Sequence, residues 1–365
     1  MSERGELVRS ARAGGKVAGL SREHGVSRKT AYKWLKRYAE GGEAGLRNQS
    51  TRPRSSPRRS DPDMEALVCA LRLKYPAWGG RKLHHVLRRE GHSGVPAPST
   101  CSDILRRHGL LSQSARPQRD LMRFEAAAAN DLWQMDFKGH FATGQGRCHP
   151  LTALDDHSRF SICLQACPNE QASTVQTQLS RAFAEYGLPR SMLMDNGSPW
   201  GADADHPHTR LTAWLIRHGI TVLHGRPYHP QTQGKEERFH RTLKDELLRA
   251  AGQWRDLEHV QSAFDPWRRV YNELRPHQAI GDVPPLARYQ PSPRRFPDRP
   301  PAIEYEASDI VRRVQLKGLI TFRGRDYLVS RAFIGEPVAL RAAGDGVWDV
   351  YYCHQRVRSL SLDNV

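Results

Sequence analysis

The sequence lacks any run of about 18 apolar residues, the length that a helix needs to cross a bilayer. Residues 1–6 have no apolar segment behind them, so we expect no secretory signal peptide. The six cysteines are scattered and form no C-x-x-C pair, which argues against a disulfide framework in a chain of this size. These absences predict a protein of a reducing, cytoplasmic interior with no membrane partner.

The spacing typical of structural zinc sites is also missing. Histidine is plentiful, with 17 residues, and His84, His85 and His92 lie near Cys101 in the sequence. No C-x-x-C pair completes a tetrahedral set of ligands around them. We therefore expect no structural zinc site.

Acidic residues are few relative to basic ones. Asp and Glu number 39 against 56 Lys and Arg, which gives a net charge of +17. Such an excess binds polyanions with a steep dependence on salt. A membrane surface would also attract it, but we find no basic amphipathic helix with a bulky aromatic face. Nucleic acid is therefore the leading partner.

The length of 365 residues suggests two to four domains. Residues 1–50 are typical of a helix-turn-helix unit: a short helix over 17–24, a turn at Gly25, and a second helix over 27–38 that Ser27 caps. We expect Tyr32 and Leu35 to face inward. An ordinary helical hairpin with a solvated basic face is the alternative interpretation. The basic residues of the second helix are the expected DNA contacts: Arg28, Lys29, Lys33 and Lys36.

A linker and a second helical unit follow. Residues 51–60 are rich in Arg, Pro and Ser, and they form either a segment that lies along phosphates or a solvated tether. Residues 61–115 predict three helices, over 63–75, from 78 through 89, and over 99–108 with Ser99 as the cap of the last. This unit is expected to be helix-turn-helix-like, with Arg106 and Arg107 as further DNA contacts.

The pattern then changes to alternating strands and helices. Residues 125–290 predict a mixed α/β sheet covered by helices. The expected strands are 132–137, 150–155, 159–166, 191–195 and 220–223, and the expected helices are 171–186, 209–218, a long helix to about 250, and 257–274. Residues 303–365 contain short strands separated by glycine turns, which predicts a small all-β barrel. The expected strands there are 310–316, 319–322, 325–329, 337–341, 348–352 and 356–362.

Three acids stand out by their context. Asp136 lies in a strand of large apolar residues, Asp195 ends an apolar strand, and Glu237 opens a basic helix. A buried aspartate is unfavourable unless it is paired or binds a metal ion. Each acid alone also has an ordinary interpretation: an edge residue, a turn residue and a helix-dipole contact. Together they indicate a carboxylate site for Mg²⁺, which prefers oxygen ligands.

The basic helix has a second pattern. Offsets of three, four and seven from Glu237 predict that one helical face carries Glu237, His240, Arg241 and Lys244. A carboxylate beside phosphate-binding side chains is what a metal-dependent enzyme acting on nucleic acid requires.

At these motifs the chain resembles the DDE insertion-sequence transposases with a retroviral-integrase-type catalytic core. The motifs are Trp133 to Asp136, Asp195 to Gly197, and His229 to Thr242. The resemblance implies a multidomain fold, with N-terminal all-α helix-turn-helix units, a central α/β ribonuclease-H-like integrase core and the C-terminal β-barrel. By motif position, the third acid is the one before Arg238, hence Glu237 and not Glu236. The spacing between Asp195 and Glu237 is longer than in the integrase pattern that the core resembles. The extra residues fall in a loop around 200–208, and loops accommodate insertions at little cost.

The resemblance also implies a chemistry. Asp136, Asp195 and Glu237 would be both the catalytic and the metal-binding residues, for two Mg²⁺ ions that Mn²⁺ can replace. The enzyme would hydrolyse the phosphodiester at transposon terminal inverted repeats and join the freed 3′-hydroxyl to target double-stranded DNA by transesterification. Synapsis of two ends implies a homo-oligomer, nucleoid-associated in a bacterial-type cytoplasm. The DNA contacts expected around the third acid are His229, Gln231, Arg238, His240, Arg241 and Lys244.

Two other functions fit parts of the sequence. A catalytically inactive, regulatory DNA-binding protein derived from a transposase would keep the helix-turn-helix units, although all three acids are present here. A ribonuclease-H-like nuclease that only hydrolyses would not need these units and a β-barrel. His229 also has an alternative role in ordering its loop.

Overall fold

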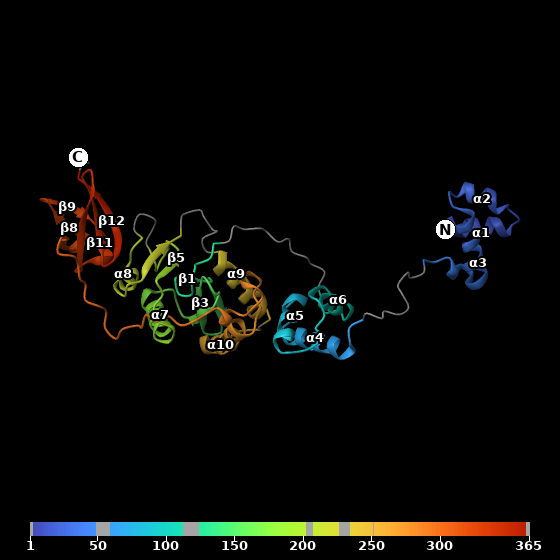
Figure 1. Ribbon diagram of the computed structural model, residues 1–365, viewed down its shortest axis with the longest axis horizontal. Coiled ribbons are helices and arrows are strands. Elements are labelled where there is room, and N and C mark those ends of the chain that lie inside the picture. The colour runs from blue at the N-terminus through green and yellow to red at the C-terminus, as the bar shows by residue number, and fades with distance from the viewer. Residues whose placement is uncertain are drawn as a thin grey trace. The chain divides into compact units, whose positions relative to one another are not determined.

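The computed structural model describes residues 3–48, 59–111, 124–201, 207–225, 234–250 and 252–362. The chain forms two compact units, Met1–Arg59 and Ser60–Val365 (Figure 1). The boundary between them lies within the predicted linker over 51–60. The finer domain boundaries within the second unit stay a prediction.

The first unit is built from helices over the described residues 3–48: α1 (Glu3–Arg12), α2 (Val17–Glu23) and α3 (Arg28–Gly45). The predicted cap is confirmed, because the backbone N–H of Thr30 donates to Ser27 Oγ at 3.1 Å. The predicted inward orientation of Tyr32 is wrong, since 60% of this side chain is exposed and Ala31 is buried instead. The sequence pattern did not show α1, in which Leu7 and Val8 are buried.

The second unit begins with three further helices: α4 (Pro62–Lys74), α5 (Gly80–Arg89) and α6 (Pro98–Arg107). Ser99 is not the cap of the last helix, because Pro98 occupies the first turn and its fixed φ starts the helix after Ala97. Gly80 permits close packing of α5 on α6, since a Cβ there would lie 2.4 Å from Ser102 Oγ. Trp78, Leu83 and Ile104 share the core of this group.

The central sheet is mixed, as predicted. Its order is β2-β3-β1-β5-β6, with β4 paired to β3. Strand β1 pairs antiparallel with β3 and parallel with β5, and β5 pairs parallel with β6. The short β2 was not predicted, and β3 begins earlier than expected. The strands are β1 (Leu132–Phe137), β2 (Phe141–Thr143), β3 (Gly146–Asp155), β4 (Ser161–Cys167), β5 (Ser191–Met194) and β6 (Thr221–His224).

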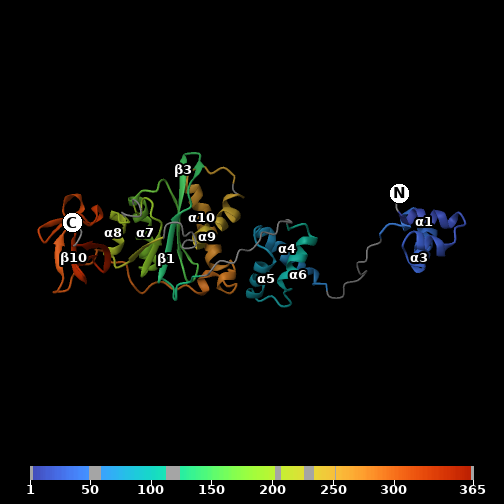
Figure 2. The same ribbon diagram turned by 90° about the horizontal axis from the view of Figure 1, so that it is seen from above.

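Helices cover both faces of this sheet (Figure 2). Trp133 and Met135 of β1 pack in one apolar cluster with residues of α7 and α8. Because side chains alternate along a strand, Gln134 and Asp136 point to the opposite face, where α9 and α10 pack. The helices are α7 (Ala172–Tyr186), α8 (Arg210–Arg217), α9 (Gly234–Leu243) and α10 (Leu257–Glu273). The predicted long helix is not α-helical throughout. Its α-helical part, α9, ends at Leu243, and a π-helical turn, Lys244–Leu248, follows.

Glutamine side chains form hydrogen bonds with free backbone groups on two edge strands of the sheet. On β4, the amide of Gln261 in α10 accepts from Ala166 N at 2.9 Å and donates to Leu164 O at 3.2 Å. On β6, Gln355 does the same for Val222, with distances of 2.8 and 3.0 Å. Unpaired strand edges invite association with other chains, so these two amides protect the sheet.

The C-terminal part is all-β, as predicted. A four-stranded antiparallel sheet has the order β12-β11-β10-β7, and β8 pairs with β9. The strands are β7 (Ile310–Arg313), β8 (Leu319–Phe322), β9 (Arg325–Leu328), β10 (Pro337–Gly344), β11 (Val347–Tyr352) and β12 (Gln355–Ser361). The short 3₁₀ helices of the second unit are Gln278–Ile280, Pro285–Ala287, Leu316–Gly318 and Arg331–Phe333.

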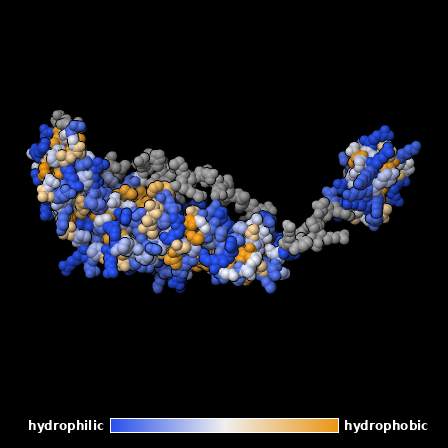
Figure 3. All heavy atoms as spheres, in the orientation of Figure 1, coloured by the Kyte–Doolittle hydropathy of each residue, from blue (hydrophilic) through white to orange (hydrophobic). Residues whose placement is uncertain are grey.

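The surface is largely hydrophilic on the visible face, with apolar side chains scattered over it (Figure 3). Among the described residues, no helix is both long and apolar enough to cross a membrane.

Candidate active site and nucleic-acid surface

Asp136 lies near the end of β1, on the sheet face that α9 covers. In the sheet it is paired with Thr152 of β3. The side chain is half-buried, and burial raises its pKa to about 7, with the neighbouring charge of Asp195 adding to the shift. Asp136 is therefore an acid held in a place where negative charge is unfavourable without a cation.

Asp195 directly follows β5, the parallel neighbour of β1. The chain turns sharply here, and the Gly197 N–H donates to Asp195 Oδ1 at 3.2 Å. Glycine suits this turn because a Cβ at position 197 would lie 3.2 Å from the other carboxylate oxygen. Partial burial raises the pKa of Asp195, and the Gly197 hydrogen bond opposes that rise.

Glu237 lies in the first turn of α9 and is exposed. Its negative charge contributes to the raised pKa of Asp136, as does that of Asp195. The structure thus brings Asp195 and Glu237 each within electrostatic reach of Asp136. Within the described residues, however, no three His, Cys, Asp or Glu side chains stand close enough together to hold one metal ion.

The neighbouring Glu236 has the opposite environment. It is fully buried, and its Oε2 accepts a hydrogen bond from the hydroxyl of Thr152 at 3.0 Å. Burial raises its pKa well above the ordinary value, and the charge of Asp136 adds to the shift. Consecutive acids on one helix thus point to different sides of it.

His240 belongs to the buried side of α9. We predicted that it shares a face with Glu237, but its Nε2 lies 2.8 Å from Thr152 Oγ1 and 3.6 Å from Glu236 Oε2. Burial lowers its pKa to about 3, and the nearby Lys138 adds to the shift. Because His240 is four residues after Glu236, it lies on the same face of the helix and also points inward. The predicted shared face with Glu237 is therefore wrong, while the DNA contact of His240 stays a prediction.

Comparisons with known proteins follow the same division of the chain. Residues 126–230 and 218–285 each match an integrase core domain, and residues 309–364 match the C-terminal domain of IS481 family transposases. Residues 3–54 match a helix-turn-helix domain and residues 30–105 a homeodomain-like domain. The chain thus contains matches to an integrase core domain, to a C-terminal domain of IS481 family transposases and to helix-turn-helix domains.

Individual proteins are similar to parts of this chain. An uncharacterized 39.2 kDa protein of insertion element IS476 from Xanthomonas euvesicatoria is 27% identical over 66% of this chain and 69% of its own length. An uncharacterized protein of insertion element IS407 from Burkholderia multivorans is 27% identical over 67% of this chain and 88% of its own length. The crystal structure of the catalytic core domain of BIV integrase aligns with 43% of this chain and 92% of its own, at 28% identity and a TM-score of 0.33.

Within this integrase core, a fourth carboxylate lies near two of the three predicted acids. The charge of Glu170, in the loop before α7, raises the pKa values of both Asp136 and Asp195. His149 contacts Glu170, with Nδ1 and Oε1 2.8 Å apart. The sequence analysis missed Glu170, although its position between β4 and α7 was a signal for a loop that could reach the site.

The basic residues around the core site are of two kinds. Arg238, Arg241 and Lys244 are exposed on α9 and the turn that follows it. Lys138, which was not predicted, is half-buried beside them; burial and the charge of Lys244 lower its pKa. The predicted contacts His229 and Gln231 lie outside the described residues.

The predicted DNA-contacting residues in the helical units also differ in their surroundings. Arg28, Lys29, Lys33 and Lys36 are all exposed along α3, and Arg106 is exposed at the end of α6. Arg107 instead pairs with the buried Glu65, with Nη2 and Oε1 2.5 Å apart. This pairing gives Arg107 a structural role in joining α6 to α4.

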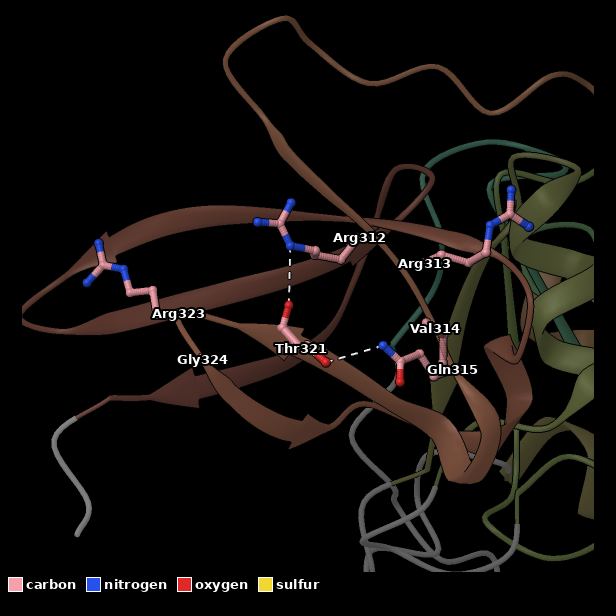
Figure 4. Close-up of a pocket in the computed structure, with 7 residues that line it drawn as sticks. All are labelled: Arg312, Arg313, Val314, Gln315, Thr321, Arg323 and Gly324. Atoms are coloured by element: carbon pink, nitrogen blue, oxygen red, sulfur yellow. Dashed lines mark hydrogen bonds between the residues drawn. The ribbon is translucent and has the colours of Figure 1, made fainter.

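A separate basic pocket of about 650 Å³ lies in the C-terminal part (Figure 4). Two hydrogen bonds to Thr321 order its wall, from Arg312 Nε to the carbonyl at 3.2 Å and from Gln315 Nε2 to the hydroxyl at 3.2 Å. No carboxylate lines it, so the pocket suits an anion and not metal chemistry. The lining residues are Arg312, Arg313, Val314, Gln315, Thr321, Arg323 and Gly324.

Proposed function

We propose that this protein is a DDE transposase that processes transposon terminal inverted repeats and joins them to target DNA. The observation that supports this most is the electrostatic coupling of Asp136 to both Asp195 and Glu237. These acids come from two adjacent parallel strands and from the start of a helix that covers the same sheet face. Carboxylates in such a cluster repel one another unless a cation lies among them.

The donor chemistry of these residues fits a divalent metal ion. Carboxylate oxygens are the ligands that Mg²⁺ and Mn²⁺ prefer. Burial, and then the charges of Asp195, Glu170 and Glu237, raise the pKa of Asp136, so a cation beside it would favour its ionised form. Asp136, Asp195 and Glu237 would hold two Mg²⁺ ions. When bound, these ions would activate the attacking oxygen and stabilise the leaving oxygen of a phosphodiester.

The reaction consists of two displacements at phosphorus. In the first, a water oxygen attacks at the transposon end, the phosphodiester breaks, and a 3′-hydroxyl is released. In the second, this 3′-oxygen attacks a target phosphodiester and displaces the target's own 3′-oxygen, so one bond forms as one breaks. No covalent intermediate with the protein is needed in either step.

The basic residues position the DNA in this proposal. Arg241 and Lys244, with Lys138 beside them, would hold phosphates near the acids, because exposed cations bind the backbone of any sequence. The start of α3 would read the terminal repeats in the major groove. We place the second DNA-binding domain in 61–115, the core in 125–290 and the β-barrel in 303–365. Two ends must meet for joining, so the active form would be a homo-oligomer.

A strand-transfer assay on terminal-repeat DNA tests this function. The wild-type protein should convert labelled end DNA and a target plasmid into joined products with Mg²⁺. Asp136→Asn should abolish both cleavage and joining, while Asp345→Asn in an exposed C-terminal turn should leave them intact. Nicking without joining in the wild type would indicate a hydrolytic nuclease instead.

One observation favours a second candidate, an inactive regulatory DNA-binding protein. No three metal-binding side chains are gathered into one cluster in the part of the chain that the structure describes. In the same assay, binding of end DNA without any cleavage in Mg²⁺ or Mn²⁺ would support this candidate.

A further inference from the structure

Three consecutive residues at the start of α9 point in three directions. Lys235 Nζ forms an ion pair with the fully buried Asp156, which follows β3, and also donates to the Asp156 carbonyl at 3.2 Å. Glu236 points into the core toward Thr152. Glu237 points outward, to the side from which its charge reaches Asp136.

We propose that Glu236 and Thr152, together with the Lys235–Asp156 pair, are positioning residues that fix the rotation of α9 and so hold Glu237 opposite Asp136. This inference rests on the proposed function, because it assigns the purpose of these contacts to the metal site. None of the positioning residues is proposed to touch the metal ions or the DNA.

Thr152 lies between the strand that carries Asp136 and the helix that carries Glu237. Its hydroxyl oxygen lies 2.9 Å from the carbonyl oxygen of Asp136, 3.0 Å from Glu236 Oε2 and 2.8 Å from His240 Nε2. A hydroxyl has one proton to donate, so the Asp136 carbonyl and Glu236 Oε2 are alternative acceptors for it, and the hydroxyl oxygen can accept from His240 Nε2 when that nitrogen carries a proton. The backbone of Asp136 and the residue preceding Glu237 both lie within hydrogen-bond distance of this one hydroxyl.

Helix geometry makes this rotation decisive. Successive residues of an α-helix are about 100° apart, so a turn of that size would exchange the places of Glu236 and Glu237. A single contact would leave the helix free to roll about it. The contact at position 235 and the contacts at positions 236 and 240 lie on two parts of the helix surface, about 100° apart, and together they prevent this roll.

The burial of Glu236 is costly for a residue that only fills space. Its Oε1 is buried and has no hydrogen-bond partner among the described residues. Burying a polar atom without a partner typically costs about 1–3 kcal/mol, whereas an apolar side chain of similar size would pack there without that cost. The hydrogen bond to Thr152 fixes the orientation of this acid, because such a bond has a preferred length and angle.

Mn²⁺ binding to the full-length protein tests the inference without DNA. Free Mn²⁺ can be measured by electron paramagnetic resonance as it is titrated into each variant, and circular dichroism reports folding. Glu236→Leu should fold but bind Mn²⁺ about 10- to 100-fold more weakly, the range expected when a supporting contact of a metal site is lost. Glu236→Gln, which keeps an acceptor for Thr152, should stay within about threefold of the wild type.

A second pair of variants covers the case in which Glu236→Leu does not fold. Thr152→Val removes the hydroxyl at nearly constant volume and should weaken Mn²⁺ binding, whereas Thr152→Ser should restore it. Wild-type Mn²⁺ affinity in Thr152→Val, or in a folded Glu236→Leu, would overturn the inference. So would a loss in Glu236→Gln as large as that in Asp136→Asn, since Glu236 would then be a ligand itself.

The result also separates this inference from the proposed function. If Asp136→Asn does not weaken Mn²⁺ binding, the metal site itself is wrong. If Asp136→Asn weakens binding while the Glu236→Leu and Thr152→Val variants bind normally, only the positioning role fails.

Discussion

The two sides of helix α9 differ although their residues alternate along ten positions of sequence. The inner side carries Lys235, Glu236 and His240, whose polar atoms contact groups of the core. The outer side carries Glu237 and Arg241, which are exposed. Both sides contain an acid and a base, so composition does not distinguish them.

This difference shows that burial decides whether a charged side chain of α9 serves the structure or is available to bind metal and phosphate. On the inner side the pKa of Glu236 is raised and that of His240 lowered, so both residues favour their neutral forms and act through hydrogen bonds. On the outer side, water keeps the charges available for metal and phosphate. We therefore expect inner variants to change stability and geometry, and outer variants to change catalysis and DNA binding.

The largest expected effect separates the two adjacent acids. Glu237→Gln should reduce strand transfer at least about a thousandfold, roughly 4 kcal/mol in the activation barrier, because a metal ligand contributes several kcal/mol of charge stabilisation. Glu236→Gln should retain activity within about tenfold, because it keeps the Thr152 contact. Rates of joined-product formation at saturating Mg²⁺ measure both. Equal losses in the two variants would remove the distinction between the sides.

The buried anchor of the inner side should dominate stability. Asp156→Asn leaves the charge of Lys235 in a largely buried position without its partner, and breaking such a pair costs about 3–5 kcal/mol of the free energy of unfolding. Asp103→Asn breaks a surface pair with Arg106, in which both side chains are more than half exposed, and should cost at most about 1 kcal/mol. Urea unfolding followed by circular dichroism compares them. Similar losses in the two variants would show that Lys235 is not held by the core.

The sequence predicted the strands of the site well because alternation marks which side of a strand is buried. Trp133 and Met135 around Gln134 identified β1, and the apolar run before Asp195 identified β5. It missed α1 and β2. The first lacks a strong apolar stripe, and the second has only three residues.

The rotation of α9 could not be predicted in the same way. His240 is three residues from Glu237 and four from Glu236, and both offsets put two side chains on one helical face. Only the core resolves the choice: Phe239 and Leu243 pack against the sheet and turn Glu236 and His240 inward. Long-range contacts such as that between Thr152 and Glu236, which lie 84 residues apart, leave no local signal.

A smaller effect is expected from the titration of His240. Its pKa is lowered to about 3 in the folded protein, by burial and by Lys138, while an unfolded histidine has a pKa of 6.5. Between these values the unfolded chain binds a proton that the folded chain does not, so stability is lost as the pH falls from 6.5 toward 3. Relative to His240→Gln, the wild type should lose about 2.5 kcal/mol between pH 7 and pH 4.5.

Urea unfolding at several pH values measures this difference. Glu236, which faces His240 at 3.6 Å, is present in both proteins, so subtracting the two curves isolates the histidine. A pH-independent difference between them would mean that His240 is already accessible to protons in the folded state.

The smallest effect should come from the outer cations, because each contributes one phosphate contact. Arg241→Gln and Lys244→Gln should each weaken binding to any duplex DNA about three- to tenfold at moderate salt, with a reduction of about 1 in the slope of log affinity against log salt concentration. Arg249→Gln is a matched control, because Arg249 is exposed just beyond the π-helical turn but pairs with Asp245. Fluorescence anisotropy with catalytically inactive Asp136→Asn protein avoids cleavage during the titration. An unchanged salt slope in both variants would remove these residues from the DNA path, and the outer side of α9 would then serve only the acids.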